Sequence, residues 1–419
     1  MGKDKINLHF ISLEKFIFVV YTLLMKTIDD YNFKDKKALI RIDFNVPLDD
    51  EGNVTDSTRI EAAKPTIIKV LEDGGSVVLM THLGRPKNKE AKFSLQQIVS
   101  KISEIMGVET KFVNDCVGDV AENAVNDLKP GEILLLENLR YHQEETEGDS
   151  GFAKQLSNLG DIYVNDAFGT AHRAHASTTV VAKYFEEKCF GYLLKQEIES
   201  LNKVLNSAEK PVTAIIGGAK VSSKITVLEN ILDKVDHLII GGGMAFTFIK
   251  AQGGKIGSSL VEDDKQELAL EILKKASKKG VEVHLPVDSI IADSFSEMAN
   301  KDVCPIDDIP EGWMGLDSGP KSVDLFSDVV LKSKTILWNG PIGVFEMEAF
   351  AEGTMKLGQA IGKATANGAF SLVGGGDSVA AVKKFNLEND VSYVSTGGGA
   401  MLEMLEGKTL PGIKAISED

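Results

Sequence analysis

The feature of this sequence that most constrains its fold is a regular alternation of short apolar runs with segments of helical periodicity. Each run is rich in Val, Ile and Leu and is followed by a loop; helical periodicity is clear over Gln266–Lys279 and Val379–Phe385. Strands that are apolar throughout and alternate with helices form parallel sheets covered on both faces, so we expect an α/β protein. The expected strands are Ala38–Asp43, Ser76–Thr81, Glu132–Leu136 and Asp161–Val164 in the first half, and Val212–Ile216, His237–Ile240, Val281–Leu285, Thr335–Trp338, Ala369–Val373 and Val391–Val394 in the second.

The two sets of strands are separated by a long polar helical segment at residues 191–210. At about 150 residues per domain, a chain of 419 residues is expected to hold two domains or three. We place the boundary in this segment. In parallel sheets of this kind ligands bind at the carboxyl ends of the strands, so the residues just after each strand carry the functional information.

Charge and cysteine content exclude several classes of protein. The chain has 46 Lys and Arg against 62 Asp and Glu, a formal net charge of −16. A protein that binds duplex nucleic acid or an anionic membrane needs a basic face, so we expect no nucleic-acid or membrane partner, although a small basic pocket is compatible with this charge. The three cysteines, Cys116, Cys189 and Cys304, form no Cys-x-x-Cys pair. Their spacing argues against a disulfide framework or a thiolate zinc site and fits a reducing compartment.

Residues 1–24 differ in character from the rest of the chain. Their apolar run, Phe16–Leu24, has nine residues, far fewer than the roughly 20 that span a bilayer. Charged Glu14 and Lys15 precede it and no Ala-x-Ala-like cleavage site follows, so the segment is a poor signal peptide. We expect the true first residue to be Met25 and residues 1–24 not to be part of the fold. A disordered tail and a membrane-leaning tail are the alternatives.

The loops after the first-half strands are polar and basic. All five arginines lie in the first half of the chain, and four lie in loops or at a loop-to-helix junction: Arg59, Arg85, Arg140 and Arg173. The planar guanidinium pairs well with carboxylate and phosphate groups. An acidic protein that places its few arginines at strand ends is expected to bind a small anion there. The alternative is that each arginine is a surface ion-pair partner, which four equivalent positions disfavour.

The histidines divide in the same way. His82, His172 and His175 lie in these loops, whereas His237 and His284 lie in strand patterns and are expected in the core. The i, i+3 spacing of His172 and His175 is compatible with a metal on a helix, but no third ligand is evident. Hydrogen bonding to a substrate or to a carboxylate is the favoured interpretation.

The loops after the second-half strands are rich in glycine. Glycine lets the backbone approach a ligand closely, and a helix that begins after the loop points free N–H groups at an anion. Lys220 and Lys224 are i, i+4, and Asp377 beside one loop could hold Mg²⁺. These loops predict a polyphosphate or adenine site, because the alternative of tight turns alone does not explain five of them. They begin at Gly217, Gly241, Asn339, Gly374 and Thr396.

Two common nucleotide signatures are absent. The Gly-Lys-Thr at residues 407–409 lacks the first glycine of a Walker loop, since Leu402 holds that position, and the glycine loops do not complete Gly-x-Gly-x-x-Gly. An anion site in one half and a nucleotide site in the other predict phosphoryl transfer, which needs positioning and charge neutralisation rather than a nucleophilic triad. A dehydrogenase on a similar fold and a catalytically silent binding protein are the alternatives.

Eight longer sequence motifs occur in the same loops and strand ends. They are RIDFNVP (41–47), THLGRP (81–86), ENLRY (137–141), AFGTAHRAHAS (167–177), GGAKVSSKI (217–225), WNGPIGVFE (338–346), GGGDS (374–378) and STGGGA (395–400). With these motifs the sequence resembles the phosphoglycerate kinase family from about Met25 to the C-terminus. The resemblance implies an α/β fold with two doubly wound parallel-sheet (Rossmann-like) domains joined by a helical hinge. It implies a glycerate-substrate domain over residues 25–193 plus 403–419 and a nucleotide-binding domain over residues 194–402.

The same resemblance implies the reaction and its residues. The reaction is reversible transfer of the acyl phosphate of 1,3-bisphosphoglycerate to ADP, which gives 3-phosphoglycerate and ATP. Residues implied to hold the glycerate substrate are Asp43, Phe44, Asn45, Arg59, His82, Leu83, Gly84, Arg85, Arg140 and Arg173. Those implied to hold the nucleotide are Lys220, Lys224, Gly315, Asn339, Glu346, Gly375, Gly376, Asp377 and Ser378. The implied catalytic residues are Arg59, Lys220, Gly376 and Gly399, and Asp377 is the implied ligand of Mg²⁺.

The resemblance further implies a cytoplasmic monomer whose two domains close during the reaction. Closure is expected to bring Arg59 near Lys220 and to exclude water, because hydrolysis competes with transfer in an open site. The sequence departs from the family in two places. Ser378 stands where many members have threonine, which keeps the hydroxyl, and residues 1–24 are not part of the family core.

Overall fold

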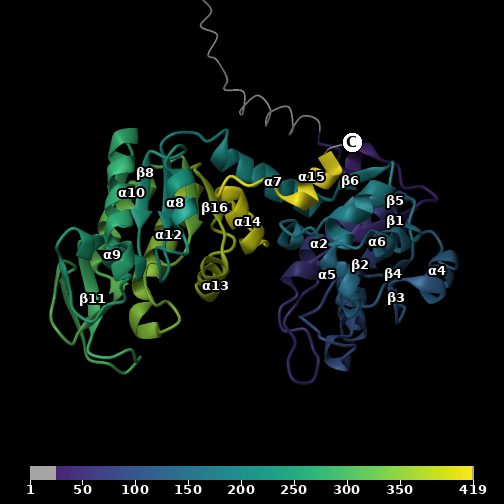
Figure 1. The fold of residues 1–419 in the computed structure, drawn as a ribbon, viewed down its shortest axis with the longest axis horizontal. Helices are drawn as coiled ribbons and strands as arrows, with labels where there is room; N and C mark the ends of the chain where they lie inside the picture. The colour runs from purple at the N-terminus through teal and green to yellow at the C-terminus, as the bar shows by residue number, and fades with distance from the viewer. Residues whose placement is uncertain (1–24, 418–419) are drawn as a thin grey trace, which may run out of the picture. The chain divides into compact units, whose positions relative to one another are not determined.

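The structure is a computed structural model that describes residues 25–417 (Figure 1). The predictions about residues 1–24 lie outside the described residues. Contacts divide the chain into two compact units: the first unit ends at Glu199 and resumes at Thr409, and the second unit is Ser200–Lys408. Helix α7, Tyr192–Leu205, carries the chain from the first unit into the second. The exact domain boundaries expected from the sequence stay a prediction.

The first unit is built on a parallel sheet of six strands in the order β3-β4-β2-β1-β5-β6. The first strand, β1, lies inside the sheet with β2 on one side and β5 on the other, so the chain winds outward in both directions from this point. Such a reversal opens a site at the carboxyl ends of the two neighbouring strands. The strands are β1 Lys37–Arg41, β2 Ser76–Met80, β3 Thr110–Phe112, β4 Ile133–Leu135, β5 Ile162–Asn165 and β6 Lys188–Phe190. The helices are α2 Thr58–Glu72, α3 Val99–Met106, α4 Gly118–Asn126, α5 Gln143–Glu147 and α6 Ser150–Ser157.

The second unit repeats the same plan with a parallel sheet in the order β10-β8-β7-β15-β16-β17. Its reversal point is β7, which pairs with β8 and β15. The predicted α/β fold with two parallel sheets is therefore confirmed. The strands are β7 Val212–Ile216, β8 His237–Ile240, β10 Glu282–His284, β15 Thr335–Asn339, β16 Phe370–Val373 and β17 Tyr393–Val394. The helices are α8 Ile225–Ile231, α9 Met244–Ala251, α10 Gln266–Lys279, α11 Pro320–Lys332, α12 Glu352–Ala366, α13 Gly376–Lys384 and α14 Gly398–Leu405.

A smaller layer of strands in the second unit was not expected from the sequence. It consists of an antiparallel sheet in the order β12-β11-β14 and a two-stranded parallel pair. Strand β12 is mostly exposed and polar, so it gives no apolar run. The strands are β11 Asp288–Ala292, β12 Lys301–Pro305 and β14 Met314–Ser318 in the sheet, and β9 Lys255–Ile256 and β13 Asp308–Ile309 in the pair.

Single turns of tighter or wider helix occur in the connecting loops. One of those in the first unit, Leu139–Tyr141, carries the expected site residue Arg140. The 3-10 turns are Ile28–Asp30, Ala91–Phe93, Leu95–Ile98, Leu139–Tyr141, Phe168–Thr170, Val181–Tyr184, Asp263–Lys265 and Glu348–Phe350, and Ala176–Val180 is a π-turn.

The C-terminal helix α15, Pro411–Ser417, packs against the first unit. Its backbone is fixed at Gly412, whose N–H donates to the Ala171 carbonyl at 2.9 Å. Asn165 Nδ2 donates to the Gly412 carbonyl at 3.4 Å. Ile413 and Ile416 are buried, so the helix adds apolar area to the core of the first unit. In the part of the chain that the structure describes, no helix is long and apolar enough to span a membrane.

Candidate active site

Three polar side chains meet at the carboxyl ends of β1 and β2 in the first unit. Asp43 follows β1, His82 follows β2, and Arg59 lies in the first turn of α2. Arg59 Nη1 lies 2.7 Å from Asp43 Oδ2, and His82 Nδ1 lies 3.9 Å from Asp43 Oδ1. Because β1 and β2 are paired and parallel, the residues after them are brought to the same edge of the sheet.

Two more of the predicted residues, Asn45 and Arg140, form hydrogen bonds with the backbone of the loop after β2. Asn45 Oδ1 accepts a hydrogen bond from the Gly84 N–H at 2.8 Å. Arg140 Nη1 donates to the Gly84 carbonyl at 2.6 Å. Gly84 has a φ of 61° and a Cβ there would clash with the Phe93 ring, so this position needs glycine. The contacts fix the backbone before Arg85, whose side chain is exposed.

Three of the predicted arginines line one cavity of about 690 Å³ in the first unit. Asp43, Asn45, Arg59 and His82 are not among its lining residues. The cavity therefore extends the site away from the strand ends rather than containing it. Its basic lining side chains include Arg85, Arg140, Arg173, Lys87, Lys89 and His175.

The electrostatics of this edge are those of an anion site. Burial, then the Arg41 and Arg140 guanidinium groups, hold the pKa of His82 well below its usual range. The same causes lower the pKa of His175 to about 4. Burial, followed by repulsion from Arg173 and Arg41, lowers the pKa of Arg140 to about 10. Positive charge gathered in a partly desolvated place favours binding of a carboxylate or phosphate.

Sequence reasoning missed the residues that support this cluster from below. Arg41 is the last residue of β1 and is 1% exposed, so its place inside an apolar strand hid it. Its Nε donates to Ser177 Oγ at 2.9 Å, and its Nη2 lies 3.3 Å from His82 Nδ1. Buried Glu145 accepts from Ser177 Oγ at 2.6 Å. The buried carboxylate balances part of the buried guanidinium charge.

Two other predicted residues, Phe44 and Leu83, do not point their side chains into the anion site. The side chains of Phe44 and Leu83 are buried in the core of the first unit. The Phe44 N–H donates to Thr81 Oγ1 at 2.8 Å, and the Leu83 carbonyl accepts from Asn138 Nδ2 at 2.8 Å. Their side chains therefore shape the loops from inside and do not face a ligand.

In the second unit the glycine loops enclose a cavity of about 340 Å³. Lys224 Nζ donates to Asn339 Oδ1, and Asn339 Nδ2 donates to the Gly374 carbonyl at 2.8 Å. Burial lowers the pKa of Lys224, while Asp377 raises it by a smaller amount. The predicted residues that line this cavity are Lys220, Lys224, Asn339, Gly375, Gly376, Asp377 and Ser378.

Two helix N-termini lie side by side at this cavity. Helix α13 begins at Gly376 and α14 begins at Gly398, and a Cβ at Gly398 would lie 3.3 Å from Gly375 Cα. Helix N-termini present free N–H groups and a positive dipole end, which suits phosphate. Ser378 uses its hydroxyl to accept from the Gly340 N–H at 2.5 Å. Gly399 is the second residue of α14 and is not among the lining residues.

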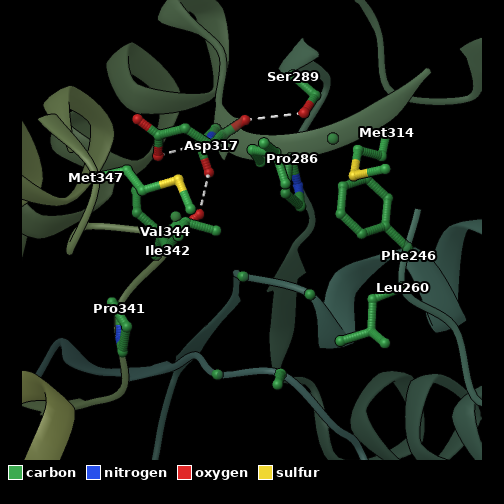
Figure 2. Close-up of a pocket in the computed structure, with 18 of the residues that line it drawn as sticks. Phe246, Leu260, Pro286, Ser289, Met314, Asp317, Pro341, Ile342, Val344 and Met347 are labelled. Carbon is green, nitrogen blue, oxygen red and sulfur yellow. Dashed lines mark hydrogen bonds between the residues drawn. The ribbon is translucent and has the colours of Figure 1, made fainter. Parts of the chain in front are cut away.

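An apolar cavity of about 680 Å³ adjoins the 340 Å³ cavity of the glycine loops in the second unit. In Figure 2 the Phe246 ring and Met314 lie on one side, and Ile342, Val344 and Met347 lie on the other. The two cavities share Gly218, Ala219 and Asp377. An apolar slot that runs into a phosphate-binding pocket is the shape of a nucleotide site.

Gly315 and Glu346, both predicted to hold the nucleotide, line this apolar cavity. Gly315 lies in β14, and a Cβ there would clash with the Phe246 ring. Glu346 is exposed in the loop after β15. The unexpected strand layer therefore supplies one wall of the site. Sequence reasoning missed the apolar lining, because Phe246, Leu260 and Met314 come from three separate segments with no shared motif.

Comparison with known proteins decides the family. The phosphoglycerate kinase family model matches residues 28–408. The chain belongs to the phosphoglycerate kinase family. It is 52% identical to the phosphoglycerate kinase of Porphyromonas gingivalis over 93% of this chain and 99% of that one. It is 53% identical to that of Chloroherpeton thalassium over 94% and 99%. The solved structure of phosphoglycerate kinase from Coxiella burnetii matches with a TM-score of 0.87 and 44% identity over 94% of this chain and 99% of that one.

Membership of the phosphoglycerate kinase family gives the enzyme class, a phosphotransferase with a carboxyl group as acceptor. The carboxylate in the phosphate cavity is also a suitable ligand for Mg²⁺. Asp377 is the one carboxylate among the described residues that line it, and its side chain is exposed there. Mg²⁺ bound to nucleotides takes one or two carboxylates together with phosphate oxygens.

The buried histidines of the anion site predict how stability changes with pH. In an unfolded chain histidine has a pKa of about 6.5, whereas the folded pKa of His82 and of His175 is lower. Below pH 6.5 the unfolded chain binds more protons, so the free energy of unfolding falls as pH decreases towards 4. The slope is at most about 1.4 kcal/mol per pH unit for each histidine.

Urea unfolding of the first unit at pH 7, 6 and 5 measures this slope. His175→Gln removes one titrating group, so its slope is expected to be shallower than that of the unchanged chain. His142→Gln, a histidine substitution at another position of the first unit, is the matched control. Equal slopes for the chain and the His175→Gln variant contradict the prediction.

Proposed function

We propose that this chain transfers the acyl phosphate of 1,3-bisphosphoglycerate directly and in line to ADP, and that the reaction is reversible. The observation that carries the proposal is the presence of two complementary half-sites in a member of this family. One is the arginine-rich edge of the first unit, and the other is the glycine-rich nucleotide cavity of the second. No described residue has to act as a covalent nucleophile.

The first unit binds the glycerate substrate. Asp43 and Asn45 offer side-chain oxygens to its single free hydroxyl group, at C2. The guanidinium groups of Arg85, Arg140 and Arg173 neutralise its non-transferring phosphate, which bidentate Arg–phosphate pairing favours. The lowered pKa of Arg140 supports this assignment, because a bound anion relieves the repulsion from Arg173.

The second unit binds the nucleotide. The apolar cavity takes the adenine, with Gly315 and Glu346 at its wall. The phosphates lie against Lys224, the Gly375–Ser378 loop and the start of α13. Asp377 holds Mg²⁺, which bridges phosphate oxygens and neutralises part of their charge.

Transfer requires stabilisation of charge on the moving phosphoryl group. Arg59 from the first unit and Lys220 from the second supply it, together with backbone N–H groups of Gly376 and Gly399 at two helix starts. The two units approach each other for the reaction, so that Arg59 and Lys220 act on the same group and water is excluded.

The remaining properties follow the family expectation. We propose a monomer in the cytoplasm with Mg²⁺–ATP and Mg²⁺–ADP as the nucleotide forms. The cysteines support a reducing compartment: Cys116, Cys189 and Cys304 are all free thiols. Size-exclusion chromatography with light scattering tests the monomer.

A coupled assay tests the activity. Purified protein is given 3-phosphoglycerate and MgATP, the product is reduced by glyceraldehyde-3-phosphate dehydrogenase, and loss of NADH is followed. We expect turnover that needs both substrates and Mg²⁺. Well-folded protein without turnover, with or without residues 1–24, rejects the proposal and favours a binding protein. Turnover of NADH without the coupling enzyme favours a dehydrogenase.

Lys224→Ala is expected to raise the KM for ATP by about 10–100-fold and to change kcat less. The ammonium group is half-buried beside Asn339 and faces the nucleotide phosphates, and a hydrogen bond to a charged group contributes about 1.5–3 kcal/mol. Initial rates at varied ATP measure the effect. Lys332→Ala, on the exposed face of α11, is the control and is expected to leave the KM unchanged. An unchanged KM for Lys224→Ala removes this residue from the nucleotide site.

A further inference from the structure

Three metal-ligating side chains meet on the paired strands β8 and β10, where His237 and Glu282 mark the amino ends of the two strands. His237 is the first residue of β8 and pairs in register with Glu282, the first residue of β10. His284 lies two residues further along β10. In paired parallel strands, register partners and residues at i+2 point to the same face of the sheet. The sheet itself therefore brings the three side chains together.

The distances between their ligand atoms fit a tetrahedral metal ion. His237 Nδ1 lies 3.2 Å from His284 Nε2 and 3.4 Å from Glu282 Oε2, and all three atoms lie within 4.8 Å of one another. With metal–ligand bonds of about 2.0–2.1 Å at tetrahedral angles, neighbouring ligand atoms are about 3.3 Å apart. Little movement is needed to place an ion between them.

The exposure of these groups also suits a metal. The side chain of His284 is buried. The side chain of Glu282 is 67% exposed and that of His237 is 25% exposed. The site therefore has a buried ligand at its base and an open side, where water can supply a fourth ligand.

We propose that His237, His284 and Glu282 form a binding site for a divalent transition-metal ion of the Zn²⁺ class. Two imidazoles and one carboxylate favour Zn²⁺, Ni²⁺ or Cu²⁺ over Mg²⁺, which prefers oxygen ligands. The site lies about 13 Å from the nucleotide loop, since four residues of strand separate His237 from Gly241 at about 3.3 Å each. Binding is independent of the proposed function, and it ties the edge strand β10 to β8.

A second cluster in the first unit makes a useful contrast. Asp115, Cys116 and His142 also bring their ligand atoms within 4.8 Å of one another. However, Lys89 Nζ lies 2.9 Å from Asp115 Oδ2, so a cation already occupies that carboxylate. Burial holds the pKa of the Cys116 thiol well above its usual range, and a protonated thiol is not a metal ligand. This cluster is not expected to bind Zn²⁺.

Zn²⁺ competition against a chromophoric chelator tests the proposal. The full chain without an affinity tag is stripped of metal and titrated with ZnCl₂ in excess Mg²⁺, which occupies carboxylate-only sites. We expect one Zn²⁺ per chain in a site that His237→Gln and His284→Gln each weaken. Loss of a ligand should cost at least the roughly 10–100-fold typical of losing an outer-shell partner. Glu282→Gln is expected to weaken binding less. Visible absorption of the Co²⁺-loaded chain should show the intense bands of four-coordinate geometry and lose them in both histidine variants.

Control variants show whether Zn²⁺ binds at His237, Glu282 and His284 or elsewhere on the chain. His142→Gln, in the second cluster, is the control and is expected to keep the Zn²⁺ affinity of the unchanged chain. Turnover in the coupled assay without Zn²⁺ shows that each variant is folded. If His284→Gln fails to fold, His237→Gln and Glu282→Gln decide, because their side chains are more exposed. Zn²⁺ affinity unchanged in His237→Gln, or lost in His142→Gln instead, overturns the proposal.

Discussion

Arg59→Ala is expected to lower kcat by about 10²–10³-fold, the usual cost of removing one donor to a developing charge, and to change the KM for 3-phosphoglycerate much less. Arg59 Nη1 holds Asp43 at 2.7 Å, and the guanidinium is 36% exposed. Its other N–H groups remain available to a transferring phosphoryl group. The variant therefore loses an interaction made mainly in the transition state.

Initial rates of the coupled assay at varied 3-phosphoglycerate separate kcat from KM. Arg59→Lys is the informative second variant, because it keeps the charge and loses the fork geometry, and we expect an intermediate rate. The thermal midpoint of each variant should fall only slightly, since the Arg59 side of its ion pair with Asp43 is open to solvent and such pairs contribute little to stability. An unchanged kcat in Arg59→Ala removes Arg59 from the catalytic role.

Lys220→Ala is expected to lower kcat by a similar factor of about 10²–10³. Lys220 is exposed in the loop between β7 and α8 and lines the phosphate cavity. Its ammonium group is therefore free to follow the phosphoryl group between donor and acceptor.

Comparison with Lys224→Ala separates an effect on kcat from an effect on the KM for nucleotide. Both lysines line the same cavity, yet Lys224 is tied to Asn339, and its loss should appear in the KM for nucleotide. Steady-state kinetics at saturating ATP isolate kcat for each variant. If Lys220→Ala raises only the KM, the two lysines have the same role and the assignment of Lys220 to transfer is wrong.

The parallel sheets were predictable because most of their strands are short apolar runs that alternate with helical segments. The expected helix Gln266–Lys279 coincides with α10. Strands β3 and β6 were not expected, because each contains a lysine among its few residues and gives no apolar run. The β11, β12 and β14 sheet, whose strands pair antiparallel, was hidden for a different reason. Strand β12 is mostly exposed, and β11 and β14 are largely buried but contain Asp, Ser or Gly, so none of the three gives a continuous apolar run.

The site shows a similar division. Loop residues such as Arg140 and Asp377 stood out because polar groups after apolar strands are conspicuous. Arg41 did not, since its guanidinium function depends on contacts with Ser177 and His82 that only the folded chain creates. His237 and His284 were expected in the core. His284 is buried, but His237 is partly exposed, and their closeness depends on strand pairing that the sequence does not specify.

The return of α15 to the first unit has a consequence for synthesis of the protein. The second unit is one continuous stretch, Ser200–Lys408, whereas the first unit is interrupted and is finished by residues that are translated after the whole of the second unit. The second unit can complete its core first, but the first unit waits with the surface beneath Ile413 and Ile416 uncovered until residues 409–417 have left the ribosome. A nascent chain stalled before residue 409 should therefore present chaperones with an apolar patch on an otherwise formed amino-terminal half.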